Sequence, residues 1–172
     1  MLLYDANRDG KSDLSETKLV ELLPGEFGVH GMCQGPDGAL YVACGSESGV
    51  DKLGPTLTRS RSPVLEPKLG TILRVSAGER EVIADGFCNP GDVAFTAAGN
   101  LLTVDVDNRP DLGLPWYAPT RLYDVAVGRN HGWRVAGKRS GWFPPAYDPR
   151  SVERAAELGT GVPTGLTTYR HR

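Results

Sequence analysis

The residues with the clearest chemical spacing lie between positions 5 and 16, where the chain reads DANRDGKSDLSE. Oxygen-bearing side chains occupy the first, third, fifth, ninth and twelfth positions of this stretch, and a glycine occupies the sixth. This is the spacing of an EF-hand calcium loop, whose seventh position offers a backbone carbonyl. The predicted calcium ligands are Asp5, Asn7, Asp9, Lys11, Asp13 and Glu16.

The run that leads into this loop, LLYD, is typical of a strand rather than a helix. We therefore expect a calcium-type loop inserted between two strands, in which the ion would hold like-charged carboxylates together. The alternative is a solvated turn, rich in Asp, Asn and Gly, that binds no metal.

The elements that must position the other candidate residues are β-hairpins, because one stretch of the chain occurs twice. Residues 29–45 (VHGMCQGPDGALYVACG) resemble residues 91–107 (GDVAFTAAGNLLTVDVD), and aligning Met32 with Val93 places Gly31 at the position of Asp92. Each copy alternates apolar and polar residues on both sides of a glycine-containing turn, which is the pattern of a β-hairpin. Residues 162–168 (VPTGLTT) repeat the first part of the same pattern and predict a third such strand.

Further strand pairs are predicted before and between the two hairpins, at 2–5 with 18–23 and at 71–75 with 81–85, and another strand is predicted at 120–127. The unit is thus about four strands long, and it repeats at a spacing slightly above the roughly 40–50 residues of a propeller blade. The sequence therefore predicts an all-β fold, a partial β-propeller of about two and a half blades.

A closed propeller has roughly 4–8 blades, so two and a half blades do not close a ring. We expect residues 1–172 to form a single partial propeller domain that is incomplete at both ends, as a fragment of a longer protein would be. Residues 46–69 are rich in Pro and Ser and lack periodicity, which predicts an irregular surface insertion.

Polar residues near the inner strands are the next candidates, because the innermost strands of a propeller line its central channel, where ligands bind. Asp105, Asp107 and Asn108 end the second hairpin and are candidate ligand-binding residues. The alternative for them is an Asx-type turn that leads into Arg109. His30 lies within the first inner strand, where a lone histidine is more often a packed core residue than a catalyst.

The composition argues against several classes of partner. A net charge of −2, with only one short basic run at 59–61, argues against a nucleic-acid partner. No run approaches the roughly 18 apolar residues of a membrane helix, and no signal peptide is visible, so neither is predicted in this chain. The three cysteines form neither Cys-x-x-Cys nor Cys-x-x-Cys-His, which favours small buried side chains over a metal or redox role.

The order of motifs along the chain is similar to one known family. The motifs are DxNxDGxxD, HGxxxGPDGxLY, GFxNPxDVAF, DNxxDLGLPWYxPTR, NHGWR and PTGL, of which the fourth is the most specific. Over essentially all 172 residues the chain resembles the membrane-bound dehydrogenase domain of planctomycete-type bacteria, which in turn resembles soluble glucose/sorbosone dehydrogenases. The resemblance implies a six-bladed propeller that is exported to the periplasm or cell surface. It also implies a haem-carrying cytochrome module outside this chain.

The related sugar dehydrogenases carry pyrroloquinoline quinone and calcium, and they transfer a hydride from an alcohol to the quinone with the help of a histidine base. The resemblance places that base eight residues before Gly35, at Phe27, whose side chain accepts no proton. His30, three residues later, is the substitute candidate. An Arg–Asn pair that contacts the quinone in those enzymes falls on Cys88 and Asn89, so the cation is missing and only Asn89 is kept.

The sequence thus supports two hypotheses. The first is a dehydrogenase-like domain that oxidises a sugar or polyol, with calcium and a quinone as cofactors. Its site residues would be Asn89, Asp105, Asp107 and Asn108 around the channel and His30 as the base. The second is a non-catalytic propeller that keeps the calcium loop and binds a glycan or a protein partner. The sequence leaves open whether the chain is an enzyme.

Overall fold

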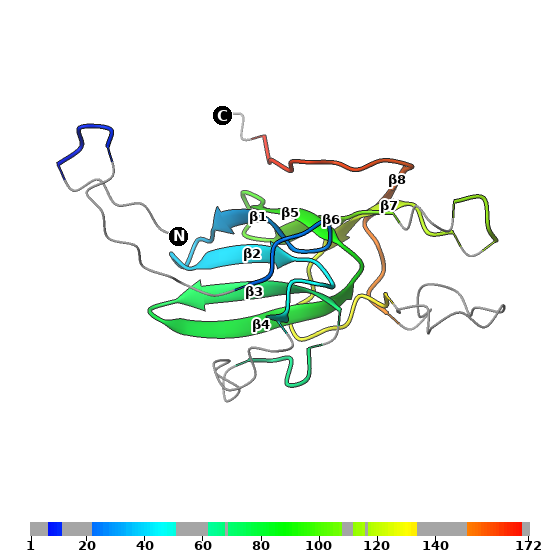
Figure 1. Ribbon diagram of the computed structural model, residues 1–172, viewed down its shortest axis with the longest axis horizontal. Helices are drawn as coiled ribbons and strands as arrows, with labels where there is room; N and C mark the ends of the chain where they lie inside the picture. Colours follow the sequence, from blue (N-terminus) through cyan, green and yellow to red (C-terminus); the bar gives the residue numbers. More distant parts are fainter. Residues whose placement is uncertain are drawn as a thin grey trace.

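The computed structural model of this chain describes residues 7–11, 22–50, 62–67, 69–107, 112–115, 117–133 and 151–169. They form two four-stranded antiparallel sheets and no α-helix, and the strands of each sheet follow chain order (Figure 1). The first sheet contains β1 (Val29–Gln34), β2 (Leu40–Cys44), β3 (Gly70–Ser76) and β4 (Glu79–Phe87). The second contains β5 (Pro90–Phe95), β6 (Leu101–Asp105), β7 (Thr120–Asp124) and β8 (Ala156–Gly159).

Two consecutive four-stranded meanders are consistent with two blades of a partial propeller. The all-β prediction is therefore confirmed. Within the described ranges, no helix is long and apolar enough to cross a membrane.

The predicted hairpin repeat is confirmed, because the two hairpins share one register. Met32 pairs with Val42 between β1 and β2, and the residues at the equivalent positions pair between β5 and β6. Each turn contains a glycine in the left-handed region, with φ of +77° at Gly38 and +90° at Gly99. A side chain disfavours that region, so the glycines permit the tight reversals that set the register.

One hydrophobic core cluster lies between the two sheets, and a second is made by residues of β2, β3 and β4 together with Val50. The rings of Phe87 and Tyr123 meet edge to face with centroids 5.8 Å apart, and those of Tyr41 and Phe95 meet in the same way at 4.8 Å. Such pairs add to the free energy gained by burying the rings. The same packing brings β1 against β5 (Figure 1), so the first residues of these two strands reach a common space.

The third predicted copy of the pattern does not form a strand, and this prediction is wrong. Residues 160–168, here called the strap, have no regular structure and run along β5. The backbone N–H of Leu166 donates to Asp92 Oδ2 at 2.7 Å, and the hydroxyl of Thr168 donates to the Phe95 carbonyl at 2.7 Å. Since these bonds use side chains of Asp92 and Thr168, they do not make a backbone ladder.

Other predicted elements are confirmed in part. The strands predicted at 71–75 and 81–85 are longer in the structure, and the one predicted at 120–127 ends earlier, at Asp124. Those predicted at 2–5 and 18–23 lie outside the described residues, apart from residues 22 and 23, which are irregular.

The predicted insertion at 46–69 contains no strand in its described parts, which are residues 46–50, 62–67 and 69. Its second half is attached to the first sheet, because the hydroxyl of Ser62 donates to the Val82 carbonyl at 2.8 Å. Val50 and Ser62 are buried, so these parts of the insertion pack into the fold rather than lying wholly on its surface.

Candidate functional site

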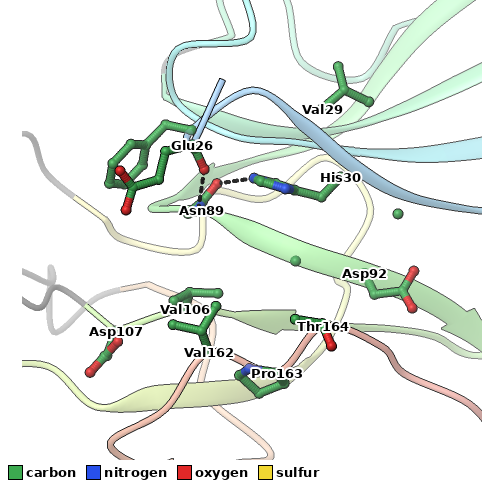
Figure 2. A pocket seen from close by; sticks show the side chains of 13 residues that line it. Glu26, Val29, His30, Asn89, Asp92, Val106, Asp107, Val162, Pro163 and Thr164 are labelled. Carbon is green, nitrogen blue, oxygen red and sulfur yellow. Dashed lines mark hydrogen bonds between the residues drawn. The ribbon is translucent and has the colours of Figure 1, made fainter. Parts of the chain in front are cut away.

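A cavity of about 960 Å³ lies where the first residues of β1 and β5 meet the end of β6 and the strap (Figure 2). Its lining combines apolar walls with a small number of polar side chains, as small-molecule sites usually do. The lining residues are Glu26, Phe27, Val29, His30, Gly31, Asn89, Gly91, Asp92, Val106, Asp107, Val162, Pro163 and Thr164. Three of the predicted site residues, His30, Asn89 and Asp107, are therefore brought together.

His30 and Asn89 form a hydrogen-bonded pair in one wall of the cavity, although they are 59 residues apart in the sequence. His30 Nε2 lies 2.7 Å from Asn89 Oδ1 (Figure 2). The amide Nδ2 of Asn89 donates to the carbonyl of Glu26 at 2.9 Å, which fixes Oδ1 as the atom that faces His30. Because Oδ1 only accepts, Nε2 of the neutral ring carries the hydrogen and Nδ1 is left as the proton acceptor.

The exposure of His30 excludes one of its two interpretations. Its side chain is exposed on β1, and among the residues that the structure describes only Asn89 bonds to its ring. The interpretation as a packed core residue is therefore wrong. An accessible imidazole with one nitrogen held in place has the arrangement expected of a general base or of a group that binds hydroxyls.

Asp105 does not line the cavity, but it holds the backbone of Asn89, which does. Its carboxylate is completely buried and accepts the backbone N–H groups of Cys88, at 3.1 Å, and Asn89, at 2.7 Å. Ionised acceptors make the stronger hydrogen bonds of this kind. Asp105 thus fixes the backbone from which the Asn89 side chain reaches His30.

Asp107 lines the cavity from the end of β6, and it is almost completely buried. Its Oδ2 accepts a hydrogen bond of 2.7 Å from the hydroxyl of Tyr117, whose oxygen is 3.2 Å from the hydroxyl of Thr160 in the strap. The carboxylate is therefore oriented by a neighbouring loop and the strap. Asn108, the last of the predicted residues here, lies outside the described residues.

Asp92 is a cavity residue that the sequence analysis did not select. It stands on β5 at the place that Gly31 holds on β1, and a Cβ on Gly31 would overlap its side chain. Its Oδ1 accepts the N–H of Val93 at 2.8 Å, and its Oδ2 accepts the N–H of Leu166 in the strap at 2.7 Å. The sequence does contain a signal for Asp92, because the two hairpin copies differ at this position: one has a carboxylate and the other a glycine.

The described lining does not fit an anionic quinone. Pyrroloquinoline quinone carries carboxylates, which need cationic or N–H donors. The charged lining side chains within the described ranges are the carboxylates of Glu26, Asp92 and Asp107, with no Lys or Arg among them. At the position where the resemblance implies an arginine, the Cys88 side chain is buried, and Phe27 forms part of the cavity wall.

The predicted calcium loop is described only over residues 7–11, so Asp5, Asp13 and Glu16 lie outside the described residues. Asn7 Oδ1 accepts the N–H of Asp9 at 3.0 Å, and Asp9 Oδ1 accepts the N–H of Lys11 at 2.8 Å. Gly10 has φ of +81°, as a sharp turn at the sixth position requires. Within the described residues no group of three or more His, Cys, Asp or Glu side chains could hold a metal ion, so the calcium loop stays a prediction.

His131 is the other histidine within the described ranges, and it has no access to the cavity. It is completely buried, with its ring stacked on Phe87 at a centroid distance of 4.2 Å and edge-on to Tyr123 at 5.2 Å. Burial lowers the pKa of His131 to about 4, against the opposing effect of the Asp85 and Arg129 carbonyls. His131 is a packing residue of the core.

A second cleft, of about 750 Å³, lies at the other end of β5 and contains an arginine that is paired with two carboxylates. The guanidinium of Arg74 is 2.7 Å from Asp37 Oδ2 and 3.0 Å from Glu81 Oε2. Desolvation opposes ionisation of Asp37, but the hydrogen bonds from Arg74 and the Ala39 amide hold its pKa below the usual range. These carboxylates are paired within the fold, unlike a site that awaits a ligand.

Comparisons with known proteins agree with this architecture. No protein-family model matches the chain, and no protein with a curated description matches it. Among solved structures, one neighbour is a protein of Thermus thermophilus assigned as an oxidoreductase (glucose dehydrogenase), with 25% identity and a TM-score of 0.52. That match covers 83% of this chain and 43% of the Thermus chain.

A second neighbour is the aldose sugar dehydrogenase of Streptomyces coelicolor in its PQQ-bound form, at 21% identity and a TM-score of 0.41, covering 68% of this chain and 34% of that one. The chain therefore spans less than half the length of either neighbour. The Thermus match supports a glucose dehydrogenase-like propeller fold for the described sheets.

Proposed function

We propose that this chain is part of a dehydrogenase-like propeller that binds a sugar or polyol in the cavity between β1 and β5. The observation that carries the proposal is the His30–Asn89 pair, which presents an oriented imidazole to a cavity of about 960 Å³. Apolar walls with a few fixed polar groups suit a polyhydroxylated ligand that has both C–H and hydroxyl surfaces. The assignment of the Thermus neighbour makes glucose the first ligand to test.

The chemistry that His30 could support is proton abstraction from a ligand hydroxyl. In the oxidation of an alcohol, the hydroxyl proton passes to a base while the carbon-bound hydrogen leaves with both bonding electrons to a separate two-electron acceptor. Nδ1 of His30 would accept the proton, and Asn89 would hold the ring through Nε2. We assign no residue of this chain to the acceptor, because the described lining does not fit an anionic quinone.

A second candidate function is ligand binding without oxidation. It is favoured by Phe27, which stands where the resemblance implies the base, and by the carboxylates that line the cavity. Both candidates use the same cavity and the same polyhydroxylated class of ligand. They differ only in whether electrons leave the ligand.

Isothermal titration of the purified chain with glucose and with sorbitol tests the binding that both candidates require. We expect saturable heat that is lost in His30→Ala and Asn89→Ala. The matched control is Arg74→Met, which alters the cleft at the other end of β5 and should bind like the parent. A parent that gives no saturable heat with either ligand would contradict the proposal.

Reduction of a two-electron acceptor dye in the presence of calcium, measured with and without added quinone, then separates the two candidates. Reduction that depends on the sugar and disappears in His30→Ala supports the dehydrogenase. Binding without dye reduction supports the non-catalytic propeller. A Phe27→His variant that gains activity absent from the parent would show that the base position itself decides the difference.

We also propose that Asp5, Asn7, Asp9, the carbonyl of Lys11, Asp13 and Glu16 form a structural calcium loop. The successive side-chain-to-backbone bonds at Asn7 and Asp9 and the positive φ of Gly10 support it. Calcium should raise the unfolding temperature of the chelator-treated chain and release saturable heat, and Asp9→Ala should remove both effects. Full retention of both in Asp9→Ala, or their absence from the parent, contradicts the calcium loop.

We further propose that the complete protein is a six-bladed propeller exported to the periplasm or cell surface. Two and a half blades would be a little under half of such a ring, as is the 43% share of the Thermus chain that this chain covers. Sequencing the DNA that flanks the reading frame tests this. Further blades in frame, preceded by a signal peptide, would support the proposal, and stop codons at both ends would contradict it.

A further inference from the structure

The strap forms one wall of the cavity without regular structure, and no backbone ladder holds it among the residues that the structure describes. Val162, Pro163 and Thr164 of the strap line the cavity opposite His30 (Figure 2). The position of these residues therefore depends on the few hydrogen bonds that attach the strap to the second sheet. Any residue that sets this position also sets the width of the cavity.

Side chains of the second sheet and its loops attach the strap at both of its ends. At its start, the hydroxyl of Thr120 donates to the Gly161 carbonyl, and Thr160 bonds to the Tyr117 hydroxyl. At its end, the hydroxyl of Thr168 donates to a carbonyl of β5. The bond from Leu166 N–H to Asp92 is the attachment that follows the cavity-lining residues most closely, two positions after Thr164.

Asp92 is held between two glycines of the neighbouring segments. On one side, a Cβ on Gly31 of β1 would lie 2.7 Å from Asp92 Cα and would overlap the carboxylate. On the other side, a Cβ on Gly165 of the strap would lie 3.9 Å from Asp92 Oδ2. One carboxylate thus fills the gap between β1, β5 and the strap, and only glycine fits beside it on the β1 side.

Both carboxylate oxygens of Asp92 accept a backbone N–H, from Val93 and from Leu166. An amide side chain of the same shape has only one acceptor oxygen, so it would turn an NH₂ group toward one of these two N–H donors. Asparagine therefore keeps either bond but not both, whereas leucine keeps the branched shape and, having no acceptor atom, removes both bonds. The two functions of this side chain, filling the gap and bonding the strap, can be separated by substitution.

We infer that Asp92 is a positioning residue that holds the strap as the closing wall of the cavity, through its bond to the Leu166 amide. One part of the inference, that ligand affinity depends on Asp92, rests on the proposed function. The attachment itself is a property of the unliganded chain. Asp92 acts on the ligand through the strap rather than by touching the reacting atoms.

Hydrogen exchange of individual amides, measured by NMR without ligand, tests the attachment. In Asp92→Leu we expect the Leu166 amide to exchange at least about tenfold faster, as the loss of one charge-assisted hydrogen bond implies. The amides of β2 and β3 should exchange at the parent rate. Gly31→Ala, which displaces the Asp92 carboxylate from the other side, should reproduce the effect.

The matched control is Thr168→Val, which removes another strap bond but leaves Asp92 and Leu166 in place. It should leave the Leu166 amide protected. An unchanged Leu166 exchange rate in Asp92→Leu would overturn the inference. So would equal acceleration at Leu166 and throughout β2 and β3, because that result indicates global destabilisation.

Titration with glucose supplies the second readout. We expect a dissociation constant several-fold higher in Asp92→Leu and Gly31→Ala than in the parent and in Thr168→Val. If no variant and no parent binds glucose, the proposed function fails while the exchange result still decides the attachment. If the parent binds and Asp92→Leu binds equally well despite faster Leu166 exchange, Asp92 does not position the ligand and the inference is overturned.

Discussion

His30 lies exposed at the cavity, whereas His131 is completely buried between the rings of Phe87 and Tyr123. Their hydrogen bonds are reversed as well. Nε2 of His30 faces an acceptor, Asn89 Oδ1, but Nε2 of His131 accepts the Ala126 N–H at 3.4 Å.

The Nδ1 atom of His131 is correspondingly 3.1 Å from a carbonyl acceptor, that of Asp85. The two rings are therefore expected to be opposite tautomers. In buried His131 both ring nitrogens form hydrogen bonds within the fold, whereas in exposed His30 Nδ1 is left for a ligand. One residue type thus serves packing in one region and chemistry in the other, and its surroundings decide which.

The largest effect on stability should follow from removing the buried ring of His131. His131→Ala should lower the free energy of unfolding by about 3 kcal/mol or more, because it empties a fully buried site that two aromatic rings enclose. His30→Ala should change it by less than about 0.5 kcal/mol, as exposed substitutions usually do. Urea unfolding of both variants measures the difference, and equal losses would refute the contrast between the two regions.

Acid should destabilise the chain through the same buried ring. The pKa of His131 is lowered to about 4 in the fold, so the unfolded chain takes up a proton first as the pH falls below about 6.5. The stabilisation that comes from a neutral His131 is complete above about pH 6.5. It is lost as the pH falls towards 4, which lowers the free energy of unfolding by about 3 kcal/mol in total. Unfolding measured between pH 8 and pH 4 in the parent and in His131→Phe checks this, since the variant should lose less stability over that interval.

A small effect should also come from Arg74, whose network lies away from both histidines. The side chains of Arg74 and Asp37 are 25% and 37% exposed, so water screens their attraction. Arg74→Met should therefore cost no more than about 1 kcal/mol. A large loss of stability, or any loss of glucose binding, would show that the cleft at the far end of β5 is coupled to the cavity.

The fold could be predicted from local sequence because the hairpins carry their own turn chemistry. Gly38 and Gly99 occupy turns that require positive φ, and the alternating residues on either side then determine the register. The prediction of a strand at 162–168 was wrong because the repeat pattern does not show whether the N–H groups of a segment donate to a backbone carbonyl or to a side chain. At this segment the partner is the carboxylate of Asp92.

The site could be predicted only as separate residues. His30, Asn89 and Asp107 were selected one by one, and their meeting depends on how β1 packs against β5, which no local pattern encodes. Asp105 was selected for its chemistry as well, but its carboxylate turns inward to the backbone of Cys88 and Asn89. Whether a strand-end carboxylate faces a ligand or an amide is decided by tertiary packing.

The central claim is that His30 is the ligand-facing histidine of a sugar or polyol site, and imidazole NMR during a glucose titration tests it most directly. The chain has three histidines, so His131 serves as an internal control that lies out of reach of the ligand. We expect the free chain to show Nε2–H at His30 and Nδ1–H at His131, and glucose to shift the His30 ring resonances saturably while those of His131 stay constant. His30 resonances that do not move with glucose or sorbitol, or that move only together with those of His131, would contradict the account.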